Sequence, residues 1–310
     1  MILGLDIGGT KTAVLLGTED GRVLWRKQFV TAPKRGFKPV FQEIVATAEE
    51  ALRAAPDAAY EPVECIGVSI GGPMDSVTGV IKSPPNLPHW DNIPLKQMLS
   101  EKFSLPVYVE HDGNAGALAE WLFGAGKGYK NLAFITMGTG FGAGLILDGR
   151  LFRGPGNTAG EVGHIRIAED GPRCFGKAGS LEGYGSGTGM ALLARSMFPK
   201  RYNEYTTVQE VYRDFKKDVP EAAEVFQLAG KYVGRGLAIM ADMINPECII
   251  LGGLGMRIGD AINGPMLEAF NAEALKEAAD VCSIVPAKLG ESIGDIATIA
   301  AALYQRKHDS

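Results

Sequence analysis

The sequence lacks the features that mark several large classes of protein. Its four cysteines, at positions 65, 174, 248 and 282, are widely scattered and form no Cys-x-x-Cys pair. This usage suits a reducing compartment better than a disulfide scaffold. The longest uncharged stretch, residues 131–147, is broken by glycines and too short for a transmembrane helix. Asp6 and Lys11 interrupt the N-terminus too early for a signal peptide. We therefore expect a cytoplasmic protein with no membrane partner.

Dense clusters of Lys and Arg are also absent, and the formal net charge is −5. A nucleic-acid surface needs such clusters to neutralise phosphates, so we expect no nucleic-acid partner. Two common nucleotide-binding motifs are missing as well. The Walker pattern GxxxxGK[ST] does not occur, and GxGxxG does not occur between a strand and a helix. Any bound polyphosphate must therefore be held by a different kind of loop.

The sequence contains one hairpin pattern that occurs twice. Residues 3–21 and residues 132–149 each read as an apolar strand, a turn rich in Gly and Thr, a second apolar strand and an Asp-Gly turn. Each hairpin is followed by further strands and helices, which argues for mixed α/β layers. The duplication predicts two similar domains with a cleft between them. We expect a small N-terminal domain of residues 1–113, completed by a C-terminal helix at 295–310, and a larger domain of residues 114–294.

The remaining elements follow from apolar periodicity and turn residues. The proline-rich segment 83–94 is expected to be an ordered loop without regular structure, with Trp90 exposed. The helix at 114–124 is the expected crossing point between the domains. We predict strands at 22–30, 65–70, 106–112, 247–253 and 282–286, and helices at 37–52, 114–124, 220–245, 264–279 and from 295 onward.

The two glycine turns have the chemistry of a phosphate site. Glycine lets the backbone approach a ligand closely and point its N–H groups at an anion. Thr10 and Thr139 add hydroxyl donors, and Lys11 adds a cation. A polyphosphate fits between two such turns. The alternative is a pair of ordinary tight hairpins whose glycines only satisfy turn geometry.

Seven motifs together resemble the ROK family (repressors, open reading frames and kinases), and the resemblance covers nearly the whole chain. The motifs are LDIGGTK, GVSIGGPMD, VEHDGNAGALAE, MGTGFGAG, GEVGH, GSLEG and NPECIILGG. That family includes sugar kinases with the duplicated, ribonuclease-H-like fold of actin and hexokinase. The resemblance implies ATP and Mg²⁺ as cofactors, a sugar as substrate, and a homo-oligomer, either a dimer or a tetramer.

The resemblance also assigns roles to individual residues. It makes Asp112 the catalytic base that accepts the hydroxyl proton, and Asp6 the residue that orients Mg²⁺ through water. A helix cap remains the alternative for Asp112, and a turn-stabilising carboxylate remains the alternative for Asp6. The nucleotide-binding residues implied are Asp6, Gly8, Gly9, Thr10, Lys11, Gly138, Thr139, Gly140, Gly142, Gly252 and Gly253. The sugar-binding residues implied are Gly72, His111, Asp112, Asn114, Glu161, His164 and Glu182.

The sequence departs from the family pattern in two places. Many members have three cysteines after the histidine of GEVGH, and these join that histidine on a structural Zn²⁺. Here Arg173, Phe175 and Ser180 fill those positions, and Cys174 alone cannot complete a tetrahedral site, so we predict no structural zinc. The second departure is His111, where the family usually has Asn. Either the imidazole changes the sugar preference, or the exchange leaves specificity unaltered.

These observations predict an ATP-dependent sugar kinase that phosphorylates a hexose, with the C6 hydroxyl as the expected acceptor and Asp112 as general base. Two alternatives remain: a ROK-type sugar sensor without kinase activity, and an actin-like nucleotide hydrolase. The related repressors carry a winged-helix domain before the kinase-like part, and the first strand here starts at Ile2. A hydrolase needs no cage of sugar-binding residues such as Glu161, His164 and Glu182.

Overall fold

The computed structural model describes residues 1–54 and 61–308. The chain divides into two compact units. Unit 1 comprises Met1–Lys127, Arg153–Asn157 and Glu291–Ser310, and unit 2 comprises Gly128–Phe152 and Thr158–Gly290. The chain therefore first leaves unit 1 after Lys127, beyond the expected boundary at residue 113. Within the described ranges, no helix combines the length and apolar character needed to cross a bilayer.

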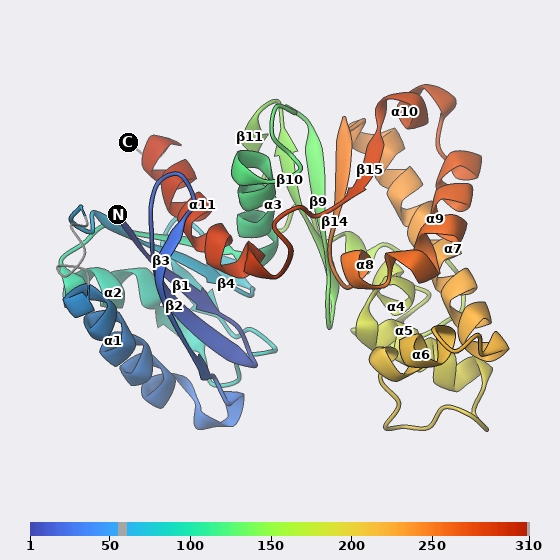
Figure 1. The fold of residues 1–310 in the computed structure, drawn as a ribbon, viewed down its shortest axis with the longest axis horizontal. Helices are drawn as coiled ribbons and strands as arrows, with labels where there is room; N and C mark the ends of the chain where they lie inside the picture. Colours follow the sequence, from blue (N-terminus) through green and yellow to red (C-terminus); the bar gives the residue numbers. More distant parts are fainter. Residues whose placement is uncertain (55–60, 309–310) are drawn as a thin grey trace. The chain divides into compact units, whose positions relative to one another are not determined.

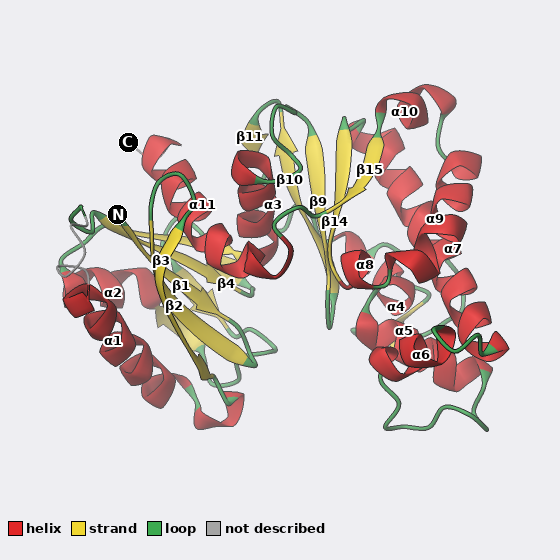
Figure 2. Cartoon of the chain, in the orientation of Figure 1, coloured by secondary structure: helices red, strands yellow, loops and turns green. Residues whose placement is uncertain are grey.

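Each unit is built on a five-stranded sheet, and the two sheets share one topology (Figures 1 and 2). In unit 1 the order is β3 (Val23–Val30), β2 (Lys11–Gly17), β1 (Ile2–Ile7), β4 (Cys65–Ile70) and β8 (Val107–His111). In unit 2 the order is β11 (Arg150–Leu151), β10 (Phe141–Leu147), β9 (Leu132–Met137), β14 (Cys248–Gly253) and β15 (Ser283–Pro286). In both sheets the first three strands are antiparallel and the last three are parallel. The duplicated ribonuclease-H-like fold is thus present.

Helices cover both faces of the unit 1 sheet, and alternation along β1 explains how. Leu3, Leu5 and Ile7 belong to a core that includes residues of α1 (Phe37–Ala54) and α2 (Leu95–Phe103). Gly4 points to the opposite face, where α11 (Ile293–His308) lies against β1 and β4. A Cβ at Gly67 of β4 would come 2.0 Å from the carbonyl oxygen of Thr298 on α11. Glycine is required here because the helix approaches the sheet so closely.

The helices of unit 2 enclose a second core. The longest, α7 (Pro220–Ile244), packs against α9 and buries residues along its whole length in the core that the sheet also lines. Asn245 ends it in the left-handed conformation, as the Asn-Pro sequence predicts. The other helices of this unit are α4 (Leu181–Gly185), α5 (Gly187–Met197), α6 (Val208–Phe215), α8 (Leu254–Arg257), α9 (Gly259–Glu273) and α10 (Lys276–Val281).

The structure corrects several expectations from the sequence. Trp90 is fully buried, with its ring edge-on to Phe37 of α1, so the expectation of an exposed side chain is wrong. The proline-rich segment contains β7 (Asp91–Pro94), which pairs with β6 (Val80–Lys82), itself paired with β5 (Met74–Asp75). The helices α2, α5 and α6 were not predicted. The helix expected at 295–310 begins two residues earlier, and residues 309 and 310 lie outside the described ranges.

Candidate active site

The candidate base, Asp112, is the first residue of α3 (Asp112–Phe123), directly after strand β8. The cap position of this helix belongs to His111, whose Nδ1 accepts the N–H of Gly113. Asp112 Oδ1 accepts the same N–H at 2.7 Å, and the Asp112 side chain is 58% exposed. Although Oδ1 shares this N–H with His111, more than half of the Asp112 side chain stays accessible at a fixed strand–helix junction.

Asp6 lies near the end of β1, in the same unit as Asp112. Burial raises its pKa from 3.8 to about 6, and the negative charges of Asp295 and Asp112 act in the same direction. The cations Lys11 and Arg26 oppose this shift only in part. Arg26 is itself paired with Asp295, with 2.7 Å between Nε and Oδ2. Asp6 is thus a buried carboxylate with two other carboxylates near it, and the nearby cations offset the effects of burial and repulsion only in part.

The first glycine turn, at residues 8–11, connects β1 to β2. It is closed by a hydrogen bond from the N–H of Gly8 to the carbonyl of Lys11. The hydroxyl of Thr31 donates to the carbonyl of Gly8 at 2.6 Å and holds the turn from the side. A Cβ at Gly9 would come 2.6 Å from the carbonyl oxygen of Asn86, so no larger residue fits without movement. The turn is tight and anchored, as a phosphate loop requires.

Of the remaining candidates in unit 1, Gly72 and His111 lie together, whereas Asn114 is turned inward. A Cβ at Gly72 would come 2.7 Å from Cδ2 of the His111 ring. Asn114 is buried, and its Nδ2 donates to Oε1 of Glu110 at 3.0 Å. A sugar contact by Asn114 stays a prediction, since its described partner is within the protein. The buried Glu110 was not singled out from the sequence.

Unit 2 brings three candidate sugar ligands together beside the second glycine turn. Glu161 and His164 flank the short 3-10 helix at Val162–His164, with 3.8 Å between Oε2 and Nε2, and both side chains are about half exposed. Oε2 of Glu182 accepts the N–H of Phe141, just after the turn that joins β9 to β10. Burial raises the pKa of Glu182. The charge of Glu161 also raises it, whereas the charge of His164 lowers it. These groups form one polar cluster.

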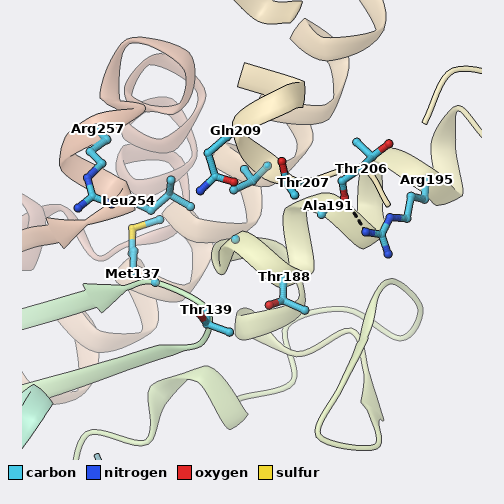
Figure 3. Close-up of a pocket in the computed structure, with 13 residues that line it drawn as sticks. Met137, Thr139, Thr188, Ala191, Arg195, Thr206, Thr207, Gln209, Leu254 and Arg257 are labelled. Atoms are coloured by element: carbon cyan, nitrogen blue, oxygen red, sulfur yellow. Dashed lines mark hydrogen bonds between the residues drawn. The ribbon is translucent and has the colours of Figure 1, made fainter. Parts of the chain in front are cut away.

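The second glycine turn forms one edge of a pocket of about 460 Å³ within unit 2 (Figure 3). Its size is within the range of small-molecule sites. The N–H of Gly187, at the start of α5, donates to the carbonyl of Gly138 and ties the turn to that helix. Most of the lining was not foreseen from the sequence. The pocket is lined by Met137, Gly138, Thr139, Gly187, Thr188, Ala191, Arg195, Thr206, Thr207, Val208, Gln209, Leu254 and Arg257.

The predicted adenosine contacts Gly252 and Gly253 lie beside this pocket rather than among its lining residues. They end β14, and Leu254, which follows them, lines the pocket and starts α8. Gly253 has a φ of +56°, and a Cβ there would come 2.3 Å from the carbonyl oxygen of Met137. Glycine therefore turns the chain toward the pocket at this position.

The opposite wall of the pocket is held by the start of α6. Thr207 caps this helix: its hydroxyl accepts the N–H of Glu210, and the Glu210 carboxylate accepts the N–H of Thr207. We expect Thr207→Ala to lower the free energy of unfolding by about 1 kcal/mol. The melting temperature should fall by roughly 2–4 °C. Thr207→Ser, which keeps the hydroxyl, is the matched control; equal melting curves for the two variants would contradict the assigned cap.

The segment that replaces the family's cysteine cluster forms a small hairpin, β12 (Arg173–Cys174) and β13 (Lys177–Ala178). Phe175, at its tip, lies beside the His164 ring with 5.2 Å between centroids. Lys177 Nζ donates to the carbonyl of His164 at 2.7 Å. In the described part of the chain, no group of three or more His, Cys, Asp or Glu residues is placed to hold a metal. That the protein carries no structural zinc stays a prediction, which elemental analysis of the purified chain tests.

Comparison with known proteins agrees with this arrangement. The sequence profile of the ROK family matches residues 2–307. The chain belongs to the ROK family. A glucokinase of Halalkalibacterium halodurans is 32% identical over 308 residues, which is 95% of this chain and 92% of that protein. The family also includes regulators: the xylose repressor of Caldicellulosiruptor bescii is 29% identical over 283 residues, 87% of this chain and 70% of the repressor.

Solved structures of ROK proteins share the fold over the full chain. A ROK hexokinase from Thermus thermophilus has a TM-score of 0.85 at 31% identity and covers 100% of this chain and 99% of its own. A ROK glucokinase from Streptomyces griseus, solved with glucose and AMPPNP, has a TM-score of 0.77 at 29% identity, covering 98% and 99%. The two-domain α/β fold of ROK sugar kinases is therefore the fold of this chain.

Proposed function

We propose that this ROK protein is an ATP-dependent sugar kinase that transfers the γ-phosphoryl group to a hexose hydroxyl, at C6. The observation that carries the proposal is the placement of Asp112. Its carboxylate is more than half exposed directly after a buried strand, and it shares the N–H of Gly113 with the neighbouring cap residue His111. Such a carboxylate can accept the proton of an attacking hydroxyl, a contribution of roughly 10²–10⁴-fold in rate.

The residues of the two units take separate parts in this reaction. Asp112 holds the acceptor hydroxyl and takes its proton. Glu161, His164 and Glu182 form a polar cluster suited to sugar hydroxyls, each of which needs a matched donor or acceptor. His111 and Gly72 border the same acceptor position. Each glycine turn offers backbone N–H groups suited to phosphate oxygens, and we assign the nucleoside to the pocket of unit 2 bounded by Leu254 and Thr188.

The carboxylates of unit 1 fit a bound Mg²⁺. Burial, and after it the negative charges of Asp295 and Asp112, raise the pKa of Asp6, so a cation bound there would favour its charged form. Mg²⁺ prefers oxygen ligands and keeps several waters while it binds phosphate oxygens. When bound, it neutralises charge on the transferring phosphates. We propose that Asp6 holds it, through water.

A sugar-responsive regulator without kinase activity is the second candidate, because repressors of this family match the chain as well. Such a protein needs the sugar cluster of unit 2 but has no need of a base. The exposed carboxylate of Asp112, which follows a buried strand, favours the kinase.

We further propose a cytoplasmic location and a homo-oligomer. The four cysteines, all within the described residues, form no disulfide, as expected in a reducing compartment. The proposal of a homo-oligomer is based on family membership alone. Light scattering on the purified protein tests it.

The proposed function is tested by ADP release from Mg·ATP against a panel of hexoses. The panel contains glucose, mannose, fructose, allose, glucosamine, N-acetylglucosamine and N-acetylmannosamine, with a control that lacks sugar. We expect turnover with one or two of these sugars and almost none without sugar. Equal ADP release with and without every sugar would identify a nucleotide hydrolase instead. Sugar binding without any ADP release would favour the regulator.

A further inference from the structure

A fully buried carboxylate, Glu110, lies two residues before Asp112 on β8 and has no part in the chemistry described above. Its exposed fraction is 0%. A buried charge is tolerated only when it is paired and its oxygens are hydrogen-bonded, and Glu110 meets both conditions. Oε2 accepts from Arg153, with Nη2 at 2.5 Å and Nε at 3.0 Å, while Oε1 accepts the N–H of His111 at 3.2 Å.

Two side-chain amides complete this cluster, and both come from helices that meet the end of β8. Gln305 of α11 donates to Oε2 of Glu110 at 2.9 Å and also to the carbonyl of Val109 at 3.0 Å. Asn114, in the first turn of α3, donates to Oε1. One carboxylate therefore joins β8, α3 and α11 at the point where the chain changes from strand to helix. The two helices also pack against each other (Figure 1).

Arg153 comes from an unusual part of the chain. The five residues Arg153–Asn157 belong to unit 1, although the chain on both sides of them belongs to unit 2. The segment is fixed to unit 1 at both ends. Arg153 pairs with Glu110, and Oδ1 of Asn157 accepts the hydroxyl of the buried Ser76 at 2.9 Å. The guanidinium of Arg153 also lies over the ring of Tyr304, 5.9 Å from its centroid.

We propose that Glu110 is a positioning residue of the phosphoryl transfer, with Arg153 and Gln305 as its partners. The inference rests on the proposed function, because it concerns how Asp112 is held. Glu110 touches no substrate. It fixes where β8 ends and α3 begins, and so it fixes the Asp112 carboxylate relative to the acceptor hydroxyl. Misplacement of a reacting group by about 1 Å costs up to roughly 100-fold in rate.

The test compares Glu110→Gln with the double variant Glu110→Gln/Arg153→Met. In the single variant the shape is retained, but the buried guanidinium loses its counter-charge. We expect kcat to fall roughly 10- to 100-fold and the KM for sugar to change by less than about threefold. The double variant removes both charges, so its melting temperature should recover toward the wild-type value. Its kcat should stay low, because neutral side chains do not restore the fixed junction.

This pattern separates positioning from a merely structural role. If Glu110 only stabilised the fold, kcat would follow the melting temperature and recover in the double variant, which would overturn the inference. Wild-type kcat in Glu110→Gln would overturn it as well. Val225→Ala, in the core of unit 2, is the control for lost stability and should leave kcat unchanged. If the wild-type protein itself shows no sugar-dependent ADP release, the proposed function fails and this inference fails with it.

Discussion

Replacement of Asp112 by Asn is expected to lower kcat by roughly 10²–10⁴-fold while sugar binding persists. The amide oxygen of Asn can still accept the N–H of Gly113, which Oδ1 of Asp112 now accepts at 2.7 Å. The junction between β8 and α3 should therefore keep its geometry, and His111 still caps the helix. What the variant loses is the group that takes the hydroxyl proton. The loss should appear in kcat and only weakly in the KM for sugar.

The measurement is steady-state ADP release together with sugar binding by calorimetry. Asp148→Asn is a matched control, because Asp148 is exposed in the turn after β10 and has a φ of +52°, a conformation that Asn tolerates. We expect this control to keep wild-type turnover. If Asp112→Asn retained a kcat close to that of the control, Asp112 would not be the base. If it lost sugar binding altogether, its main role would be in holding the substrate.

The features that the sequence predicted best are the ones determined locally. Each hairpin is specified by two apolar strands around a short Gly/Thr turn, and this pattern needs no information from elsewhere in the chain. The repeat of that pattern was enough to predict two similar sheets. The clustering of Glu161, His164 and Glu182 followed from the family resemblance, since 17 residues of varied sequence separate His164 from Glu182.

The features that the sequence did not predict depend on contacts between distant segments. Trp90 occurs among prolines and polar residues, and only its packing on Phe37 of α1 buries it. The start of α5 was missed because Gly187 and Gly189 have low helix propensity. A Cβ at Gly189 would come 2.3 Å from the carbonyl of Gly183, so tertiary packing requires the glycine inside the helix. Helix propensity alone does not show such a constraint.

Glu110 did leave a signal in the sequence. It follows Val107, Tyr108 and Val109 in a strand that otherwise reads as buried, and a buried carboxylate must have a charged partner. Its partner Arg153 comes from a segment that belongs to unit 1 only in three dimensions. The charge was therefore visible in the sequence, whereas its pairing was not. Buried charges inside apolar strands deserve the same attention as glycine motifs when a site is sought.

Replacement of Asp6 by Asn is expected to stabilise the protein and to abolish most of its activity. The pKa of Asp6 is raised from 3.8 to about 6, so between these values the folded protein binds the proton more tightly than the unfolded chain does. The wild-type free energy of unfolding therefore falls as pH rises through this window. Asn carries no charge, so the free energy of unfolding of the variant does not fall for this reason. Above pH 7 the variant should be more stable by up to about 3 kcal/mol.

Urea denaturation between pH 5 and pH 8 measures this difference, which should grow from pH 5 and become constant above about pH 7. Asp75→Asn is a control in which the change in stability is expected to have the opposite sign. Hydrogen bonds from Thr78 hold the pKa of Asp75 below its usual value. That variant should be destabilised near neutral pH. A pH-independent difference between Asp6→Asn and the wild type would show that the pKa of Asp6 is not raised in the folded protein. We expect the loss of turnover because Asp6→Asn removes the carboxylate that we propose holds Mg²⁺ through water.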